Sequence, residues 1–251
     1  MSPSTGFVDQ FVEKALSKPT PSDVSDSPPT SSKPYLFLPE LASRTSDKVE
    51  IRAEALSLLF AGRDTTAGLL TNLFFVLSHH PAVWDRLQSE IQTTLESSSD
   101  DGPRPAPTYE QLKSMRYLRA IINETQRLYP IVPMNLRVAA EDTFLPRGGG
   151  ADGTAPVFVR KGQMVLFGIY AMHRRRDLYG DDADEFRPER WLDDEPAEDG
   201  TPGKKGIRMG WEFLPFSGGP RVCIGREFFP LFSVTPILLS TNISYKNIPE
   251  C

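Results

Sequence analysis

The stretch Phe213-Leu-Pro-Phe-Ser-Gly-Gly-Pro-Arg-Val-Cys-Ile-Gly-Arg-Glu227 decides how the rest of the chain is interpreted. Its Gly-Gly-Pro triplet predicts a tight turn, and Gly225 lets another body approach the backbone closely. In such a loop, with Arg221 and Arg226 nearby to favour the anion, we expect the thiol of Cys223 to be easily deprotonated. It can then serve as a soft metal ligand or as a nucleophile. The alternative, on these residues alone, is a turn whose cysteine packs as a small hydrophobic side chain.

The composition is that of an ordinary globular protein, with 39% hydrophobic and 24% charged residues in 251. The net charge is -5 and the basic residues form no long runs, which argues against nucleic acid as a partner. Two cysteines, Cys223 and Cys251, fit a reducing compartment better than a disulfide framework. The sequence has no secretory signal and no run of about 18 apolar residues. We therefore expect no membrane anchor in this chain, which would be cytoplasmic.

Apolar periodicity predicts several helices and one short helical turn, at residues 7–16, 47–80, 82–95, 109–115 and 117–129. The longest of them is apolar on most of its circumference, which is typical of a helix at the centre of a domain. Glu90 and Arg86 are spaced for an i, i+4 ion pair. Alternation and Gly/Pro punctuation then predict short strands in a small antiparallel sheet, at residues 134–140, 143–145, 155–159 and 163–169. The expected fold class is mainly α with small β-sheets (α+β).

The longest helix is interrupted in its middle by Phe60-Ala-Gly-Arg-Asp-Thr-Thr-Ala-Gly68, a set of poor helix formers. Gly62 removes a side chain where a ligand can lie against the helix. Thr65 can turn its hydroxyl into a groove or bond back to a carbonyl, and Asp64 beside it can relay protons. The structural alternative is a glycine-kinked buried helix whose threonines satisfy the backbone.

Several charged or titratable side chains outside the cysteine stretch also stand out. Glu124 and Arg127 lie three residues apart, on one face of a helix, where a solvated pair contributes little to stability. Arg190 follows a proline-fixed segment. Arg137 is a charge in an apolar strand and needs an anionic partner or water. His173 is a lone histidine, for which a satisfied structural role is favoured over ligation.

Four segments now stand in a fixed order along the chain: 61–66, 124–127, 186–191 and 216–225. In order and rough spacing they resemble the cytochrome P450 family of haem-thiolate monooxygenases, over about Tyr35 to Phe229. Leu36-Phe-Leu-Pro-Glu-Leu41, followed by Ala61-Gly-Arg-Asp-Thr-Thr66, looks most like the fungal microsomal branch that hydroxylates alkanes and fatty acids.

The resemblance implies roles for Arg137 and for four residues of the stretch 213–227, which we call the cysteine loop. Cys223 corresponds to the proximal thiolate ligand of the iron of haem b. Arg221 corresponds to an arginine that pairs with a haem propionate, and Arg137 to a second one. Phe216 matches the aromatic residue that shields the thiolate, and Gly225 permits close packing of the chain on the haem.

Further roles are implied on the other face of the haem and beneath the loop. Thr65 corresponds to the threonine that hydrogen-bonds dioxygen, and Asp64 to the acid that feeds protons toward it. Gly62 joins the cofactor-binding set. A structural charge triad under the cysteine loop is matched by Glu124, Arg127 and Arg190.

The implied activity is insertion of one oxygen atom from O2 into an apolar substrate such as an alkane or a fatty acid. Electrons would come from NADPH through a reductase, and a full-length relative would reside in the endoplasmic reticulum membrane. The alternative function is a non-catalytic truncated fragment or pseudoenzyme that keeps the haem-ligand motifs without binding haem stably. An enzyme with a thiol nucleophile is a weaker alternative, because no acyl-transfer arrangement accompanies His173.

The chain departs from the family pattern in length and at its end. We expect a partial cytochrome P450 fold whose N-terminal half is missing. Pro230 and Pro236 interrupt the helix that the family has after the cysteine loop. The expected organisation is a short helix and flexible linker at 1–34, a partial haem domain at 35–229 and an atypical C-terminal tail at 230–251.

Overall fold

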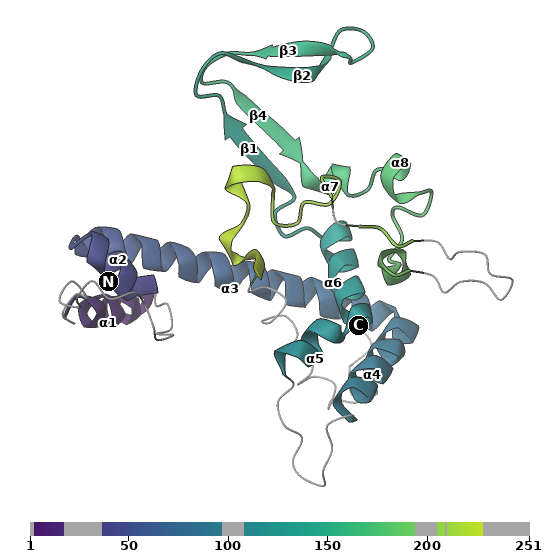
Figure 1. Ribbon diagram of the computed structural model, residues 1–251, viewed down its shortest axis with the longest axis horizontal. Helices are drawn as coiled ribbons and strands as arrows, with labels where there is room; N and C mark the ends of the chain where they lie inside the picture. Colours follow the sequence, from purple (N-terminus) through teal and green to yellow (C-terminus); the bar gives the residue numbers. More distant parts are fainter. Residues whose placement is uncertain (1–2, 18–36, 97–107, 194–204, 209, 228–251) are drawn as a thin grey trace, which may run out of the picture. The chain divides into compact units, whose positions relative to one another are not determined.

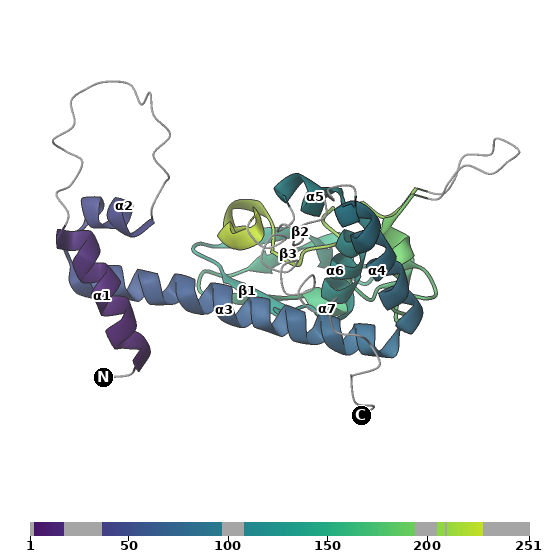
Figure 2. The same ribbon diagram turned by 90° about the horizontal axis from the view of Figure 1, so that it is seen from below.

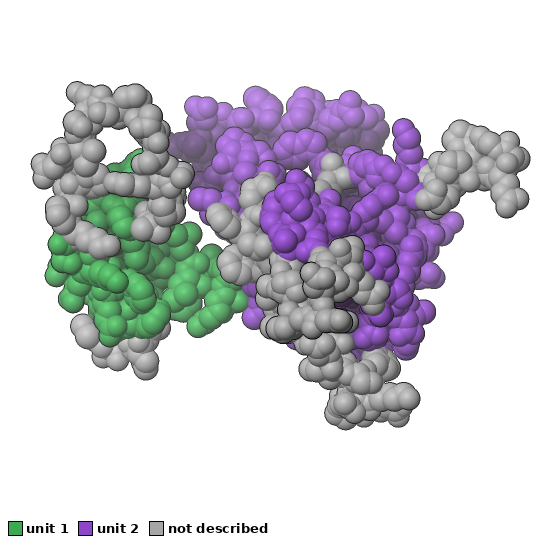
Figure 3. Space-filling model, turned by 60° about the horizontal axis from the view of Figure 1, so that its bottom comes forward, with its two compact units in different colours: residues 1–65 green, residues 66–251 purple. Residues whose placement is uncertain are grey.

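The computed structural model describes residues 3–17, 37–96, 108–193, 205–208 and 210–227 (Figure 1). The expected boundary at residue 34 and the expected tail, with Pro230 and Pro236, lie outside these ranges and stay predictions. The chain forms two compact units, residues 1–65 and 66–251, which Figure 3 colours separately. The boundary falls inside the long helix α3 (Lys48–His79), which Figure 2 shows as one continuous helix. Within the described part of the chain, no helix has the length and apolar character needed to cross a membrane.

The first unit is a small helical cluster. It contains α1 (Pro3–Ser17), α2 (Phe37–Arg44) and the first part of α3. Val8 and Val12 of α1 are buried against Ile51 of α3, as the apolar spacing of these helices predicts. The middle of α3 behaves differently from this end, because consecutive apolar side chains there are exposed, at Leu58, Leu59 and Phe60. The expectation of a fully central helix is therefore met only toward the two ends of α3.

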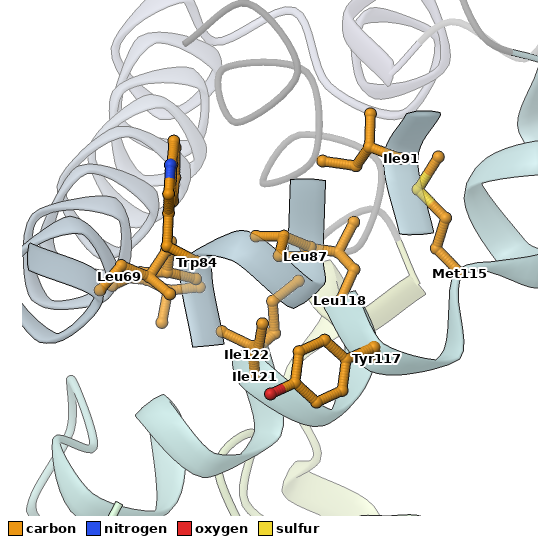
Figure 4. Close-up of a cluster of buried hydrophobic side chains, with 11 residues drawn as sticks. Leu69, Trp84, Leu87, Ile91, Met115, Tyr117, Leu118, Ile121 and Ile122 are labelled. Carbon is orange, nitrogen blue, oxygen red and sulfur yellow. The ribbon is translucent and has the colours of Figure 1, made fainter. Parts of the chain in front are cut away.

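The main core of the second unit is helical. It joins the last part of α3 to α4 (Pro81–Glu96), α5 (Tyr109–Ser114) and α6 (Arg116–Leu128). Figure 4 shows Leu69 of α3, Leu87 of α4 and Leu118 of α6 within one buried cluster. Each of these side chains is almost completely removed from water, which contributes roughly 1.5–3 kcal/mol per residue. The helices expected from periodicity are confirmed to within a few residues at their ends.

Two N-terminal caps set the starts of α5 and α6. The Thr108 hydroxyl accepts a hydrogen bond from the Gln111 backbone N–H, and the Gln111 side-chain oxygen accepts one from the Thr108 backbone N–H. This pair of bonds is a capping box. Helix α6 has no side-chain cap from its own residue. Instead the Glu90 carboxylate, on α4, accepts from the backbone N–H groups of Tyr117 and Leu118, both at 2.8 Å. A negative charge is favourable at this end of a helix.

The expected ion pair between Glu90 and Arg86 does not form, because Glu90 caps α6. Arg86 pairs instead with Glu189 at 2.9 Å and lies over the Tyr117 ring. The Tyr117 hydroxyl also donates to Glu189, at 2.9 Å. Burial and this bond to a carboxylate raise the pKa of Tyr117. Both residues lie on α4 at the expected i, i+4 spacing. The unpaired N–H groups at the start of α6 take the Glu90 carboxylate, and the carboxylate of Glu189 takes Arg86.

The strands form two separate two-stranded sheets rather than the single sheet expected. β1 (Met134–Val138) pairs antiparallel with β4 (Met164–Gly168), and β2 (Thr143–Gly149) pairs with β3 (Ala155–Val159). β2 is longer than the predicted segment 143–145 and includes Gly148 and Gly149. Gly149 is required there, because a Cβ would lie 2.7 Å from the Pro156 carbonyl oxygen. The fold class itself, mainly α with small sheets, is confirmed.

Short helical turns complete the second unit: α7 (Ile169–Met172), α8 (Arg176–Tyr179), η2 (Pro188–Trp191), η3 (Gly219–Arg221) and η4 (Ile224–Glu227). Contacts between α6 and η2 are extensive. A small cluster of buried side chains joins Ala120 of α6, Trp191 of η2 and Phe213 at the start of the cysteine stretch. The packing of α6 against η2 therefore reaches the base of this stretch.

Candidate functional site

Two opposite charges are buried together on α6. Arg127 donates to both carboxylate oxygens of Glu124, from Nε at 2.9 Å and from Nη2 at 2.8 Å, and both side chains have no exposed surface. The remaining guanidinium hydrogens reach backbone carbonyls, at 2.9 Å for His173 and 3.0 Å for Glu185. Arg127 thus connects α6 to the segments that follow α7 and α8. The solvated-pair alternative, which spacing alone would favour, is wrong.

Glu124 is also the acceptor for groups of η2. Arg190 donates from Nε at 2.8 Å and Trp191 from its indole nitrogen at 2.9 Å, while the Arg187 backbone N–H donates at 2.9 Å. We call Glu124, Arg127, Arg190 and Trp191 the Glu124 cluster. The family resemblance predicted that the three charged residues form one group. The indole donor was missed, and only its adjacency to Arg190 could have suggested it.

The charges of this cluster are balanced at its edge by Asp182. Arg190 Nη1 lies 3.5 Å from its carboxylate, and Arg187 pairs with the same carboxylate at 2.8 Å. Burial raises the pKa of Asp182, but the two positive charges outweigh this and the net shift is downward. Every buried charge of the cluster is therefore paired, which is the condition for keeping charges away from water.

His173 is buried next to the cluster. Its backbone carbonyl accepts from Arg127, and its Nε2 accepts from the Leu214 backbone N–H at 3.0 Å. The imidazole ring lies 5.0 Å from the Phe213 ring. Burial lowers the pKa of His173 to about 4. The expected structural role over ligation agrees with these contacts, but nothing in the sequence indicated the bond to Leu214, which lies 41 residues away.

The cysteine loop comprises residues 213–227. Its turn is defined by Ser217 and Gly219, whose φ angles are 60° and 69°. A Cβ on Gly218 would lie 2.8 Å from the ring of Trp211, an exposed side chain that would have to shift. The Cys223 N–H donates to the Phe216 carbonyl at 2.9 Å, and this bond closes the loop. The Gly-Gly-Pro turn predicted from sequence is present.

Cys223 is exposed in this loop. A Cβ on Gly225 would be 3.7 Å from its sulfur, an ordinary contact distance. Its neighbours Val222 and Ile224 present apolar surface, and Ile224 is 80% exposed. Exposed apolar side chains on both sides of a thiol suit a flat apolar ligand that covers them.

The two arginines implied to bind propionates are both in the second unit. Arg221 is exposed in η3, next to the cysteine. Arg137 is exposed in β1, where it donates to the Asn135 side chain at 3.2 Å and to the Leu136 carbonyl at 2.7 Å. Its guanidinium also lies 5.5 Å from the centre of the Phe167 ring. Neither arginine makes an ion pair within the described residues.

The helix residues implied on the other face of the haem lie in the first unit, whereas Cys223 lies in the second. Thr65 donates its hydroxyl hydrogen back to the Ala61 carbonyl at 2.6 Å, the bonding considered from sequence. Asp64 pairs with the adjacent Arg63 at 2.7 Å. Around Gly62, a Cβ would meet no other atom within 4 Å. The helix continues without interruption through these residues.

A single exposed thiol restricts which metal centre the site can hold. Within the described ranges no three His, Cys, Asp or Glu side chains come together as a metal site. A transition metal bound at Cys223 must therefore bring its other ligands with it, as the iron of a haem does. Exposed arginines near the thiol suit the acidic groups of such a cofactor. The residues present fit a haem, and the site resembles that of haem-thiolate proteins.

Comparison with known proteins gives the family. A cytochrome P450 family model matches residues 11–229, beginning inside α1 and upstream of Tyr35, where we expected the resemblance to start. The chain is 48% identical over 223 residues to cytochrome P450 monooxygenase himC of Aspergillus japonicus. It is 45% identical over 222 residues to cytochrome P450 52A12 of Debaryomyces hansenii and 44% identical over 222 residues to cytochrome P450 52A1 of Candida tropicalis. The chain belongs to the cytochrome P450 family.

These matches cover most of this chain but a smaller share of each relative. The alignments include 89% of the chain for the Aspergillus relative and 88% for the other two. The chain spans 37%, 40% and 38% of the lengths of these relatives, respectively.

Proposed function

We propose that the chain holds haem through Cys223 and serves a monooxygenase that inserts one oxygen atom from O2 into an apolar substrate. Electrons would come from NADPH through a reductase. The observation that carries this proposal is the exposed thiol of Cys223 on a turned loop whose base packs on the buried Glu124 cluster. Family membership supports the same chemistry.

In this proposal the residues of the second unit bind and orient the cofactor. Cys223 gives its thiolate to the iron, while Arg221 and Arg137 bind the propionates as charged hydrogen-bond donors. Phe216 and Gly225 shield the thiolate and allow close packing. When bound, haem supplies the redox chemistry with O2. The Glu124 cluster keeps the loop in position, since it is itself rigidly bonded on all sides.

The residues of α3 would handle protons and O2. Asp64 would hold a proton for transfer and Thr65 would pass it on through its hydroxyl, which requires its bond to Ala61 to open by a side-chain rotation. Gly62 leaves space for a ligand beside the helix. Loss of Asp64 or Thr65 should therefore reduce turnover in a holoenzyme while leaving haem content unchanged.

An experiment on the purified full chain tests the cofactor. Haem is added, free haem is removed by gel filtration, and the bound sample is reduced under carbon monoxide. We expect stoichiometric haem with the Soret band of a thiolate ligand. Arg221→Gln should weaken haem binding by roughly tenfold, the effect of one charge-assisted bond. Arg160→Gln, an exposed arginine on the β3–β4 turn, is the matched control and should leave binding unchanged.

The same experiment separates the alternative function. A folded chain that takes up no haem would support a non-catalytic chain that keeps the ligand motifs. A chain that binds haem without a thiolate Soret band would contradict the ligand assignment while leaving haem binding itself intact.

For the substrate class we propose alkanes and fatty acids, which the resemblance at 36–41 and 61–66 supports. A long-chain fatty acid such as palmitate, added to the haem-loaded chain, should perturb the Soret band in a saturable way. A short polar acid such as acetate should not. Equal responses to the two acids would contradict an apolar substrate.

A further inference from the structure

The base of the cysteine loop is held by a closed circuit of contacts. Trp191 donates to Glu124, and its ring lies 4.6 Å from the Phe213 ring. Phe213 in turn lies 5.0 Å from the imidazole of His173. The backbone carbonyl of His173 accepts from Arg127, which returns the circuit to Glu124. His173 is thus the member that faces both the buried charges and the loop.

One hydrogen bond of this circuit joins a side chain outside the loop to the loop backbone. His173 Nε2 accepts from the Leu214 N–H at 3.0 Å, and the imidazole is fully buried. An acceptor nitrogen carries no hydrogen, so the neutral ring must carry its proton on Nδ1. Nδ1 is buried without a hydrogen-bond partner in the described part of the chain. Backbone groups of Gln126 and Arg127 near the ring favour its protonated form, but burial outweighs them and lowers the pKa of His173, so the ring is neutral and Nε2 can accept from Leu214.

Packing holds Phe213, which is buried with Ala120 and Trp191, but leaves the next residue, Leu214, partly exposed. A cavity of about 790 Å³ lies in the second unit between α5, α6 and the loop, and both Phe213 and Leu214 line it. Cys223 is not among its lining residues. Leu214 therefore has open space on the cavity side and a hydrogen bond to His173.

We propose that His173 is a positioning residue for the cysteine loop, acting as the hydrogen-bond acceptor that fixes Leu214 and so the point from which the loop leaves the Glu124 cluster. The ring also packs on Phe213, but the acceptor nitrogen, not the ring area, sets the position. That the loop presents an iron ligand rests on the proposed function; the His173–Leu214 bond does not.

Two substitutions separate the acceptor from the ring. His173→Phe keeps an aromatic ring against Phe213 and removes the acceptor. His173→Gln loses the ring, but its amide oxygen reaches about as far as Nε2 and can accept. The matched control is His79→Phe, because His79 also lies against a phenylalanine, Phe75, with ring centres 4.7 Å apart, far from the loop in sequence.

The first readout is hydrogen exchange of the Leu214 amide in the full chain without haem, followed by NMR. His173→Phe should speed exchange by about tenfold, the effect of losing one hydrogen bond, and His173→Gln should restore most of the protection. His79→Phe should leave it unchanged. Unchanged exchange in His173→Phe, or equal loss in both variants, would overturn the proposal.

A second measurement covers a His173→Phe variant that does not fold. Nitrogen-15 shifts of the imidazoles in the unmodified chain, which has three histidines, report the tautomer directly. The proposal requires His173 to be protonated on Nδ1 alone at neutral pH, and a proton on Nε2 would contradict it.

Haem binding is a separate third readout. If the unmodified chain binds haem with a thiolate Soret band, His173→Phe should lower the thiolate-ligated fraction, and His173→Gln should restore it. If the unmodified chain binds no haem, the proposed function fails, while hydrogen exchange still decides the role of His173.

Discussion

The Glu124 cluster and the cysteine loop lie next to each other and are built in opposite ways. In the cluster, Glu124 and Arg127 are fully buried and every charge has a partner within the chain. In the loop, Cys223 and Arg221 are exposed. The side chains of the cluster bond to one another, whereas Cys223 and Arg221 of the loop are accessible to a ligand. The difference supports the proposal that the cluster supplies rigidity and the loop binds the cofactor.

The largest expected effect comes from breaking the self-contained region. Arg127→Ala leaves the Glu124 charge buried with only part of its partners, which should destabilise the chain by about 3–5 kcal/mol. Urea unfolding measures this change. Arg119→Ala removes an exposed arginine of the same helix, so it should cost less than about 0.5 kcal/mol. Equal effects of the two substitutions would contradict the structural role of the cluster. Arg127→Ala should also abolish haem retention.

His173 contacts both regions, through Arg127 and Leu214, and its contribution to the free energy of unfolding should depend on pH. Burial lowers the pKa of His173 from 6.5 to about 4, so the unfolded chain takes up a proton between these values that the folded chain does not. The stability from neutral His173 is complete above pH 6.5 and is lost as the pH falls toward 4.

This pH dependence is measured against a variant without the titrating group. The gap in unfolding free energy between the unmodified chain and His173→Gln should shrink by about 3 kcal/mol between pH 7 and pH 4. Comparison of the two chains cancels the other titrating groups. A gap that is constant with pH would show that His173 is not held neutral.

The indole of Trp191 tests whether hydrogen bonding or packing joins the regions. Trp191→Phe keeps an aromatic ring near Phe213 but removes the indole donor to Glu124 Oε2, which keeps its bond from Arg127 Nε. Losing this hydrogen bond to a charged group should cost roughly 1–3 kcal/mol. Trp211→Phe changes a side chain that is 70% exposed and should cost less than about 0.5 kcal/mol. Thermal unfolding of the two variants makes the comparison. A Trp191 variant as stable as the control would show that the indole hydrogen bond to Glu124 does not stabilise the chain.

The smallest effect is expected at a glycine of α3. Gly62→Ala meets no atom within 4 Å and should stabilise the helix by about 0.5–1 kcal/mol. Gly68→Ala is the matched change on the same helix, but its Cβ would lie 3.2 Å from Ile131, which offsets the gain. If Gly62 makes room for haem, its variant should be more stable and bind haem less tightly. No change in haem binding would remove Gly62 from the site.

The parts that sequence predicts well are those determined locally. Helices α3, α4 and α6 follow from apolar spacing, and the loop turn follows from Gly218 and its neighbours. The Glu90 cap of α6 was not predicted, because 27 residues separate the carboxylate from the first N–H it accepts. The split into two sheets likewise depends on pairing between distant strands. Local spacing carries no information about either.

The candidate site divides in the same way. The family resemblance brought Glu124, Arg127 and Arg190 together correctly, although spacing alone favoured a weak surface pair. The contacts of Trp191 and His173 were missed because no local pattern encodes a bond across 40 or more residues. The apolar middle of α3 was expected in a core, yet Phe60 is exposed.

The most direct test of the central claim is the reduced, carbon monoxide-bound spectrum of two serine variants that differ only in which cysteine is replaced. Cys251→Ser should keep the thiolate Soret band of the haem-loaded chain. Cys223→Ser should lose that band while its far-ultraviolet circular dichroism stays unchanged. A thiolate band that persists in Cys223→Ser would contradict the assignment of Cys223 as the iron ligand.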